Sequence, residues 1–350
     1  MDAYVIKGFN KVRTNEIRNK RKGVVEIMRK SRSIIVLFLL LAIILLSAYS
    51  FYSKTSFSGN SLNTNELNTR QIIPWGVESA NAPALWSDVT GKGVKVAVLD
   101  SGFDYSHPDF GDNIKEGYNA IEPGKPINDD YGHGTSMCGV IAAANNGFGI
   151  VGVAPDAELY PIKVLDEYGE GEISDIFEGI DWCIENDIQI INMSFAIEKD
   201  IPLLKSAVEK AINAGIIIIA SAGSTFNNKV GYPASYEGVI SLTAVDRKLK
   251  PGDYSPKGKI DFSAPGIDVV STVGDGCYEI CSGTSIAASY FTGLTALVLQ
   301  NPQRFGLPAG SSCTRADVYN ILKSFSKDLG EKGKDSIYGE GFVCFNKNNK

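Results

Sequence analysis

The stretch VKVAVLD, residues 94–100, is an apolar, β-branched run that ends at an aspartate and is followed by a Ser-Gly pair. Such a run is typical of a strand that is buried on both faces of a parallel sheet. Helix-like and strand-like patterns then alternate along the chain. We therefore expect an α/β fold, a doubly wound, mostly parallel sheet with helices on both faces. The alternating segments are SMCGVIAAA (136–144), AELYPIKVL (157–165), ISDIFEGIDWCIEN (173–186), IQIINMS (188–194), LLKSAVEKAINAG (203–215) and IIIIASAG (216–223).

The chain is long enough to bury one large core, with 350 residues of which 44% are hydrophobic and 21% are charged. Its charge is unevenly distributed. Met1 to Ser33 contains ten Lys or Arg residues against three Asp or Glu, whereas the whole chain has a net charge of -6. The remainder is therefore acidic, which argues against nucleic acid as a partner.

The residues Ile34 to Tyr52 form a run of nineteen without a charge, just long enough to span a membrane. The basic residues before it predict a cytoplasmic N-terminus and export of everything that follows. The run is either a single-pass anchor or the core of a cleaved signal peptide, whose proportions would be ordinary if the true start is Met28. A buried core helix is the third alternative.

Four parts are expected along the chain. Residues 1–33 form a basic cytoplasmic segment, 34–52 the anchor or signal sequence, 53–70 a polar linker rich in Ser and Asn, and 71–350 one folded domain. The domain would then lie on the extracellular face of the cell membrane or be secreted.

Six cysteines would face an oxidising compartment if the chain is exported, and their spacing is not that of a zinc site. Cys277 and Cys281 could form a disulfide only across a turn, and a second bridge could join Cys313 to Cys344. The other two, Cys138 and Cys183, lie in apolar stretches and are expected to pack as small hydrophobic residues.

Three polar residues stand where a strand stops or a helix begins. Asp100 ends the first strand, His133 lies between two glycines ahead of a small-residue helix, and Ser285 enters an apolar helix. Taken singly, each has an ordinary explanation, as a turn aspartate, a loop histidine and a helix cap. In the order Asp, His, Ser on an alternating α/β pattern, they predict one of the known catalytic triads.

The sequence around these residues, VAVLDSG, GHGTS and SGTSIA, resembles the subtilisin-like serine proteases over roughly residues 71–343. The resemblance implies a peptidase domain at 71–350 and a polypeptide substrate. Asp100 would orient His133, and His133 would take the proton from Ser285 and return it to the leaving amine. His107 in YSHPDF would be a bystander, and we expect a monomer.

The resemblance also implies a substrate cleft. VLDEYGEGEIS resembles the edge strand that pairs with bound peptide, and INMSFA resembles one wall of the pocket for the residue before the cut. Gly231 on the pocket floor predicts a roomy pocket. Glu170 and Glu172 either favour basic substrates or form a solvated acidic loop. The substrate-binding residues implied are Gly169, Glu170, Gly171, Ser194, Phe195, Ala196, Gly223 and Gly231.

A structural Ca²⁺ ion is implied in the same way, and no organic cofactor is expected. Carbonyl, amide and carboxylate oxygens are the donors that this hard cation prefers. The implied ligands are Gln71, Asp109, Ala144, Asn146, Phe148 and Ile150.

The chain departs from the family pattern at Ser224, where the family usually has an asparagine that donates to the oxyanion. A hydroxyl is shorter, and the loss of one such donor costs roughly 10²–10³ in turnover. Thr225, Asn227 or a water could substitute. The usual folding prodomain also has no evident counterpart. We therefore expect a slower or more selective endopeptidase, and the alternative is a weakened relative that binds peptides or proteins without cutting them.

Overall fold

The computed structural model describes residues 60–61, 67, 69–224 and 228–346. The predicted basic segment and the anchor or signal sequence at 34–52 lie outside the described residues. Within the described ranges, no helix is both long enough and apolar enough to cross a membrane.

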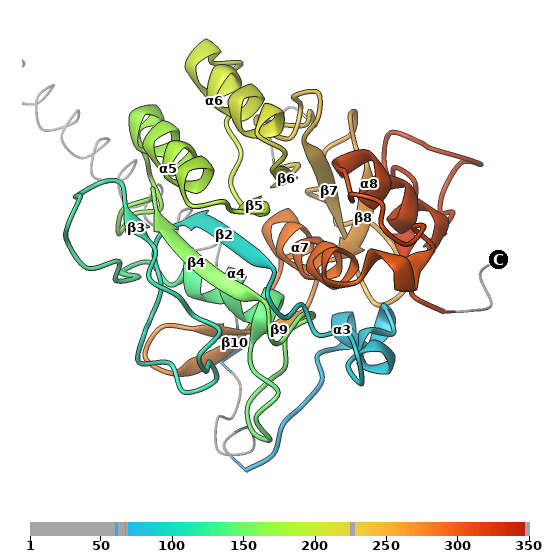
Figure 1. Ribbon diagram of the computed structural model, residues 1–350, viewed down its shortest axis with the longest axis horizontal. Coiled ribbons are helices and arrows are strands. Elements are labelled where there is room, and N and C mark those ends of the chain that lie inside the picture. The colour runs from blue at the N-terminus through green and yellow to red at the C-terminus, as the bar shows by residue number, and fades with distance from the viewer. Residues whose placement is uncertain (1–59, 62–66, 68, 225–227, 347–350) are drawn as a thin grey trace, which may run out of the picture. The chain divides into compact units, whose positions relative to one another are not determined.

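A nine-stranded sheet forms the centre of the described part of the chain (Figure 1). All neighbouring strands run parallel except the β11–β12 pair at one edge. The predicted strand at the quoted stretch is β2, which lies between β5 and β4. In spatial order the strands are β11 (Ser326–Lys327), β12 (Phe342–Val343), β8 (Phe262–Pro265), β7 (Ile240–Val245), β6 (Ile217–Ser221), β5 (Ile190–Met193), β2 (Lys95–Asp100), β4 (Glu158–Lys163) and β3 (Tyr118–Asn119).

Helices cover both faces of this sheet, so the doubly wound α/β prediction is confirmed (Figure 1). One face carries α5 (Ile173–Glu185) and α6 (Pro202–Asn213), and the other carries α4 (His133–Ala142) and α7 (Thr284–Gln300). Nearly all of α7 is buried, which explains its apolar, small-residue sequence. Shorter elements complete the domain: α3 (Trp75–Ser79), α8 (Arg315–Ser324) and the 3₁₀ turns η1 (Ala82–Leu85) and η2 (Pro302–Phe305).

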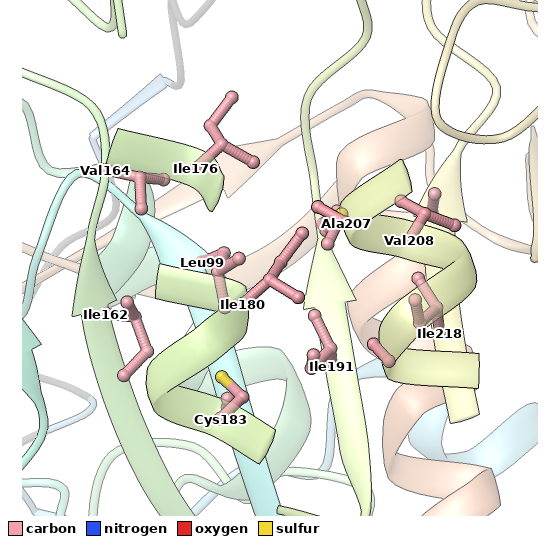
Figure 2. Packing of buried hydrophobic residues seen from close by; sticks show 14 of the residues in the cluster. Leu99, Ile162, Val164, Ile176, Ile180, Cys183, Ile191, Ala207, Val208 and Ile218 are labelled. Carbon is pink, nitrogen blue, oxygen red and sulfur yellow. The ribbon is translucent and has the colours of Figure 1, made fainter. Parts of the chain in front are cut away.

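The core under α5 and α6 shows why these segments fold as they do (Figure 2). In α5, Ile176, Ile180 and Cys183 recur at helical spacing and are fully or almost fully buried. They pack against strand residues such as Leu99 and Ile162. Each buried aliphatic side chain contributes about 1.5–3 kcal/mol to the stability of the fold, so this cluster fixes the sheet from which the polar residues project.

A small second sheet includes residues that were predicted, from their polar composition, to lie in the linker at 53–70. Strand β1 (Asn60–Ser61) pairs antiparallel with β10 (Cys277–Cys281), which pairs with β9 (Val269–Val273). Leu67 is only 4% exposed and packs in a cluster with Ile150 and Tyr278. The described residues between 60 and 70 therefore include segments that pack on the domain.

All six cysteines are free thiols in the structure. Cys138 and Cys183 are fully buried, as predicted for small hydrophobic residues. A disulfide between Cys277 and Cys281 would need a turn between them, and both instead belong to the single strand β10. Residues four apart in a strand are about 13 Å apart, too far for a disulfide.

Candidate active site

Asp100 is the last residue of β2, and its side chain is fully buried. Its Oδ1 accepts a hydrogen bond from the backbone N–H of Ser101 at 2.8 Å. The start of α4 lies close by, because a Cβ on Gly134 would be 2.2 Å from the carbonyl oxygen of Gly102. Glycine after the histidine is therefore needed for α4 to begin this close to the end of β2.

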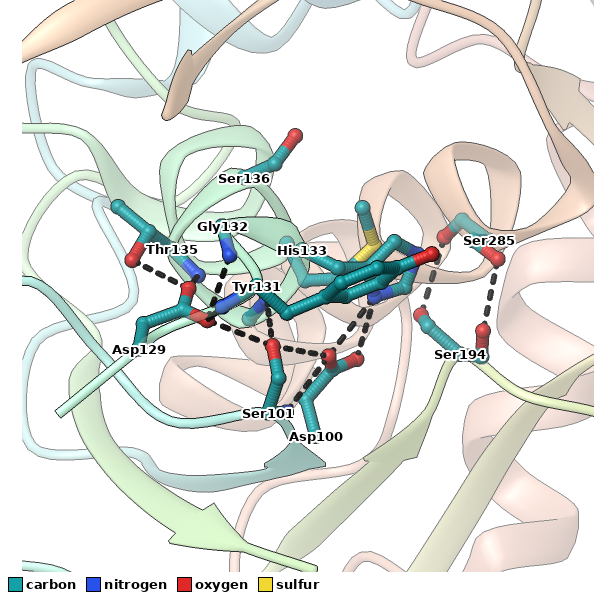
Figure 3. A network of polar contacts seen from close by, with 12 residues as sticks. Asp100, Ser101, Asp129, Tyr131, Gly132, His133, Thr135, Ser136, Ser194 and Ser285 are labelled. Atoms are coloured by element: carbon teal, nitrogen blue, oxygen red, sulfur yellow. Dashed lines mark hydrogen bonds and ion pairs between the residues drawn. The ribbon is translucent and has the colours of Figure 1, made fainter. Parts of the chain in front are cut away.

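His133 is the first residue of α4, and its ring points at Asp100 (Figure 3). Its Nδ1 lies 2.8 Å from Oδ1 and 2.9 Å from Oδ2 of Asp100. Burial works against the charged imidazolium, but the charge and hydrogen bond of Asp100, with the charge of Asp129, raise the pKa of His133 above its ordinary value. An Nδ1–H that donates to the carboxylate leaves Nε2 as the proton acceptor.

Asp129 holds the beginning of α4 in place, a role that the sequence reasoning missed. Its Oδ1 accepts from the backbone N–H of Gly132 at 2.7 Å and from the hydroxyl of Ser101 at 2.7 Å. Its Oδ2 accepts from both the backbone N–H and the hydroxyl of Thr135, each at 2.7 Å. An acidic residue just ahead of a helix start is a recognisable capping signal, so this residue could have been found.

Ser285 is the second residue of α7 and contacts Ser194, the residue that follows β5. Its hydroxyl donates to the carbonyl oxygen of Ser194 at 2.7 Å, and the Ser194 hydroxyl donates to the Ser285 carbonyl oxygen at 3.1 Å. The amide of Asn192 donates to the Ser194 hydroxyl at 2.9 Å. The close-up of this polar network contains Asp100, His133 and Ser285 together (Figure 3).

The predicted oxyanion position follows β6. The backbone N–H of Gly223 donates to the hydroxyl of Thr284 at 3.1 Å, which joins this loop to the start of α7. Ser224 comes next and is exposed. Thr225 and Asn227, the possible substitute donors, lie outside the described residues.

The predicted cleft residues surround the same end of the sheet. Ser194, Phe195 and Ala196 follow β5 directly, with exposure rising along the three. Residues 166–170 form a tight turn closed by Asp166, whose Oδ1 accepts from the backbone N–H of Glu170 at 2.9 Å. Gly169 lies in this turn and Gly171 directly follows it, and the pairing of this stretch with a bound peptide stays a prediction.

Gly231 lies directly against the segment that follows β5. A Cβ on Gly231 would lie 2.9 Å from the Cβ of Ala196 and 3.2 Å from the carbonyl oxygen of Ile197. The backbones of Ile197 and Tyr232 also exchange two hydrogen bonds of 2.8 Å. Gly231 therefore lets the chain pass close to Ala196, and the roomy pocket expected there stays a prediction.

The six residues predicted to bind calcium lie together. Gln71 Nε2 is 2.7, 3.4, 3.2 and 2.9 Å from four oxygen atoms. The Asp109 carboxylate accepts from the Asn146 amide at 3.1 Å and from the Ile150 backbone N–H at 2.7 Å. The four oxygens around the Gln71 amide are Ala144 O, Asn146 Oδ1, Phe148 O and Ile150 O.

This donor set suits a hard cation. An amide N–H₂ at the centre of four convergent oxygens occupies the position that a positive charge would favour. Burial raises the pKa of Asp109 to about 7, against the lowering effect of its hydrogen bonds. The described residues contain no group of three or more His, Cys, Asp or Glu that could hold a metal, so carbonyl and amide oxygens would supply most of the ligands.

His107 has a structural environment. It is 3% exposed, its Nε2 lies 3.0 Å from the carbonyl oxygen of Cys277, and its Nδ1 accepts from the backbone N–H of Asp109 at 3.2 Å. Burial lowers its pKa. These contacts hold the loop that carries Asp109 and fit the expected bystander role.

The site combines a buried aspartate, a histidine paired with it and a serine at a helix start, all carried by a parallel α/β sheet. This arrangement is typical of serine hydrolases. Sequence comparison identifies the family within that class. The pattern of the Subtilase family of peptidases matches residues 91–341. The chain therefore belongs to the subtilase family, which is a family of serine endopeptidases.

Individual relatives agree with this assignment. The chain is 39% identical over 280 residues to "Subtilisin E" of Bacillus subtilis (strain 168), which covers 78% of this chain and 70% of the relative. It is 39% identical over 280 residues to "Subtilisin" of Bacillus pumilus, covering 78% and 97%. It is also 41% identical over 275 residues to "Thermostable alkaline protease" of Halalkalibacterium halodurans, covering 78% and 72%.

Proposed function

We propose that the protein is a serine endopeptidase that hydrolyses peptide bonds through an acyl-enzyme, with Asp100, His133 and Ser285 as its catalytic residues. The observation that carries this proposal is the pair of short contacts between His133 Nδ1 and the buried Asp100 carboxylate, at 2.8 and 2.9 Å. A carboxylate in that place fixes the tautomer in which Nε2 can act as a base.

In the mechanism, Nε2 of His133 takes the proton of the Ser285 hydroxyl as that oxygen attacks the scissile carbonyl carbon. The hydroxyl must then donate to Nε2 in place of the Ser194 carbonyl oxygen, which it contacts at 2.7 Å. The imidazolium formed is stabilised by Asp100 and gives its proton to the leaving amine. Water repeats the sequence on the acyl-enzyme and frees the second product.

The oxyanion of the tetrahedral intermediate would be bound by the backbone N–H of Ser285 at the start of α7. Ser224 stands at the position of the second donor and offers only a short, exposed hydroxyl. We infer that this half of the oxyanion hole is weak. The hydrogen bond from Gly223 to Thr284 holds the backbone of Gly223 close to the start of α7. A longer side chain at position 224 would therefore begin from a backbone that is already held beside α7.

The experiment that tests the proposal uses the full chain and a matched Ser285→Ala variant. A fluorophosphonate probe should label the wild-type protein at Ser285 and leave the variant unlabelled. A mixed peptide library should be cut by the wild type only. A folded wild-type protein that is neither labelled nor active would refute the endopeptidase proposal.

A selective, processing role is favoured over general degradation by the weak second donor of the oxyanion hole at Ser224. Trimming the leader of a secreted peptide is one task of this kind. Unfolded casein provides the test. Rapid cutting at many sites would argue for general degradation, whereas few or no cuts are expected.

The second candidate function, a binding protein that holds peptides without cutting them, is favoured by Ser224 alone. Ser224→Asn restores a side-chain amide and separates the two. We expect the variant to cut peptides about 10²–10³-fold faster than the wild type. Unchanged, negligible turnover in a folded Ser224→Asn protein would favour the binding function.

A bound Ca²⁺ ion is proposed for the loop at residues 144–150, held by the six oxygen-bearing residues described above. The ion would supply the positive charge that the buried Asp109 carboxylate lacks. Its role would be structural, because Gln71 and the loop at 144–150 are tied together through the same four oxygens. Calcium titration followed by thermal unfolding tests it directly.

The location is part of the proposal. Residues 34–52 would either anchor the chain or be cut as a signal sequence, with 1–33 in the cytoplasm and the peptidase domain, 71–350, as a monomer outside. Cell fractionation and N-terminal sequencing of the mature protein distinguish the anchored from the secreted form.

A further inference from the structure

A cavity of about 320 Å³ lies at the amino ends of β7 and β8. Its lining includes Ile240, the first residue of β7, and Asp261, the residue before β8. The start of α8 contributes another part of the wall. Asp100, in contrast, ends β2 at the carboxyl edge of the same sheet, where the active sites of parallel sheets normally lie. The cavity is therefore separate from the candidate active site.

Three cationic side chains line this cavity, although the chain as a whole is acidic. They are Lys259, Arg315 and Lys334. The lining also contains two carboxylates, those of the buried Asp261 and the exposed Glu237. Positive charge is therefore in excess here, whereas the whole chain has a net charge of -6. A local excess of this kind attracts an anion.

The two lysines are held by Asp261 and keep donors to spare. Asp261 accepts from Lys259 Nζ through Oδ2 and from Lys334 Nζ through Oδ1, each at 2.8 Å. Lys259 also donates to the carbonyl oxygen of Val239, and Lys334 donates to the hydroxyl of Tyr319 at 3.1 Å. An ammonium group has three N–H donors. One donor on each lysine therefore remains for a ligand.

Arg315 brings a positive charge that the protein does not pair. Within the described ranges, its guanidinium forms neither an ion pair nor a hydrogen bond. Burial lowers the pKa of Lys259, and the charges of Lys334 and Arg315 lower it further, against the raising effect of Asp261. A bound anion would relieve this repulsion among the three cations.

The groups around the cavity are held in place before any ligand binds. Thr314 caps α8 just ahead of Arg315, and it forms a reciprocal capping box with Asp317. The ring of Tyr319 packs against that of Phe262, with centroids 4.9 Å apart. These contacts fix the face of α8 that lines the cavity. An anion would therefore bind to a site that is already formed, which reduces the entropic cost of binding.

We infer that this cavity binds a phosphate group, either as the free ion or as part of a small phosphate ester. A phosphate group has three terminal oxygens and a charge near -2 at neutral pH, which suits three cations better than a carboxylate does. The guanidinium of Arg315 can contact two of those oxygens together, and each lysine can contact one. The bound group would join the start of α8 to the lysines beside it. This inference goes beyond the proposed peptide hydrolysis and needs none of its catalytic residues.

Isothermal titration calorimetry tests the inference on the full chain with Ser285→Ala, a variant that prevents self-digestion. The probes are inorganic phosphate, glycerol 3-phosphate and acetate, at about 20 mM sodium chloride, where screening is weak. We expect a Kd below about 1 mM for a phosphate compound and binding of acetate at least about tenfold weaker. Tighter binding of the ester than of the free ion would identify an ester as the ligand, and the reverse would identify free phosphate. Binding of neither phosphate compound, or equally tight binding of acetate, would overturn the inference.

Variants at the cavity provide the second test. Arg315→Gln removes the charge that has no partner and should raise the Kd of phosphate about tenfold or more. Glu237→Gln removes an exposed negative charge from the lining and should lower that Kd about twofold. Arg304→Gln is the matched control, because Arg304 pairs with Asp88 at 3.0 Å and lies outside the lining. It should leave the Kd unchanged.

Circular dichroism checks that each variant folds. Arg315→Lys replaces Arg315→Gln if the glutamine variant does not fold, and it should raise the Kd less, because it keeps the charge and loses only the two-pronged contact. Equal Kd values for Arg315→Gln and Arg304→Gln would contradict binding in this cavity. Because the measurement uses a protein without its proposed nucleophile, its result is independent of whether the wild type cuts peptides.

Discussion

Asp100 and Asp109 are both fully buried aspartates, yet only one has a charged partner within the described chain. Asp100 lies 2.8 Å from the ring of His133. Asp109 accepts hydrogen bonds from two neutral donors, and among the described residues no Lys, Arg or His forms an ion pair with its carboxylate. Burial raises the pKa of Asp109 to about 7.

The two aspartates therefore differ in whether the described chain supplies an opposite charge. A buried carboxylate is unfavourable unless it is paired or hydrogen-bonded. The partner of Asp100 follows thirty-three residues later in the chain, at the start of α4. The partner of Asp109 would be a cation from solution, as the oxygen cage around Gln71 also suggests.

The largest expected effect comes from removing the charge of Asp100. Asp100→Asn keeps the size of the side chain but permits the wrong tautomer of His133, so we expect kcat to fall about 10⁴-fold, the loss found in other serine proteases. The pKa of His133 should also fall, since the Asp100 charge raises it. Steady-state kinetics between pH 5 and 9 measures both, and the acid limb should move to lower pH.

Asp109→Asn is the matched control for that experiment. With the same substitution at the other buried aspartate, kcat should change far less than with Asp100→Asn. Equal losses from the two substitutions would mean that the two carboxylates do not differ in role.

The second effect concerns stability against pH without calcium. Because the folded pKa of Asp109 is raised to about 7 from 3.8, the folded state holds a proton that the unfolded state has lost between these values. Stability should therefore fall as pH rises from about 4 to about 7 and then level off, by up to about 4 kcal/mol. Urea unfolding in EGTA at several pH values measures this slope.

Calcium should remove that dependence. The bound cation pairs with the ionised carboxylate, and at a free calcium concentration 100 times Kd it should add about 2.7 kcal/mol of stability. Calorimetry at pH 6 should also detect about one proton released on binding. A slope in EGTA that is the same in wild type and Asp109→Asn would show that another group titrates.

The third effect tests how the loop beside Asp109 is held. Leu67 is 4% exposed, packs on Ile150, and its carbonyl oxygen accepts from the backbone N–H of Gly149 at 2.8 Å. Leu67→Ala should cost about 2–3 kcal/mol of stability and weaken calcium binding. Ile73→Ala, a change at a 38% exposed residue nearby, should cost under about 1 kcal/mol in the same urea titration.

Much of the fold and site could be predicted from sequence because the signals are local. The apolar run at 94–100 and the glycines around His133 each reflect a backbone requirement that the structure displays. The order of Asp100, His133 and Ser285 along a chain of alternating strands and helices then predicted a catalytic triad. The six residues of the proposed calcium site, Gln71 among them, could be named only through the family resemblance.

The remaining features depend on contacts between distant segments. Nothing in the local sequence shows that Leu67 packs on the loop at 144–150, or that the ring of Tyr131 rests on Gly169. The close approach of Gly231 to Ala196, which follows another strand, is of the same kind. Composition describes a segment, but only tertiary packing decides what fills a space.

The smallest effect is expected where carboxylates are exposed. Glu170 and Glu172 lie in an acidic stretch beside the cleft, and both are exposed. In water and salt, an exposed charge contributes little to an interaction, typically under about 1 kcal/mol. Replacing both with Gln should therefore change the ratio of kcat/KM for matched lysine and glutamine peptides by less than about threefold at 150 mM salt. A tenfold loss for the lysine peptide would instead assign these residues a direct contact with substrate. Burial would then no longer distinguish the carboxylates with a functional role from those that are only solvated.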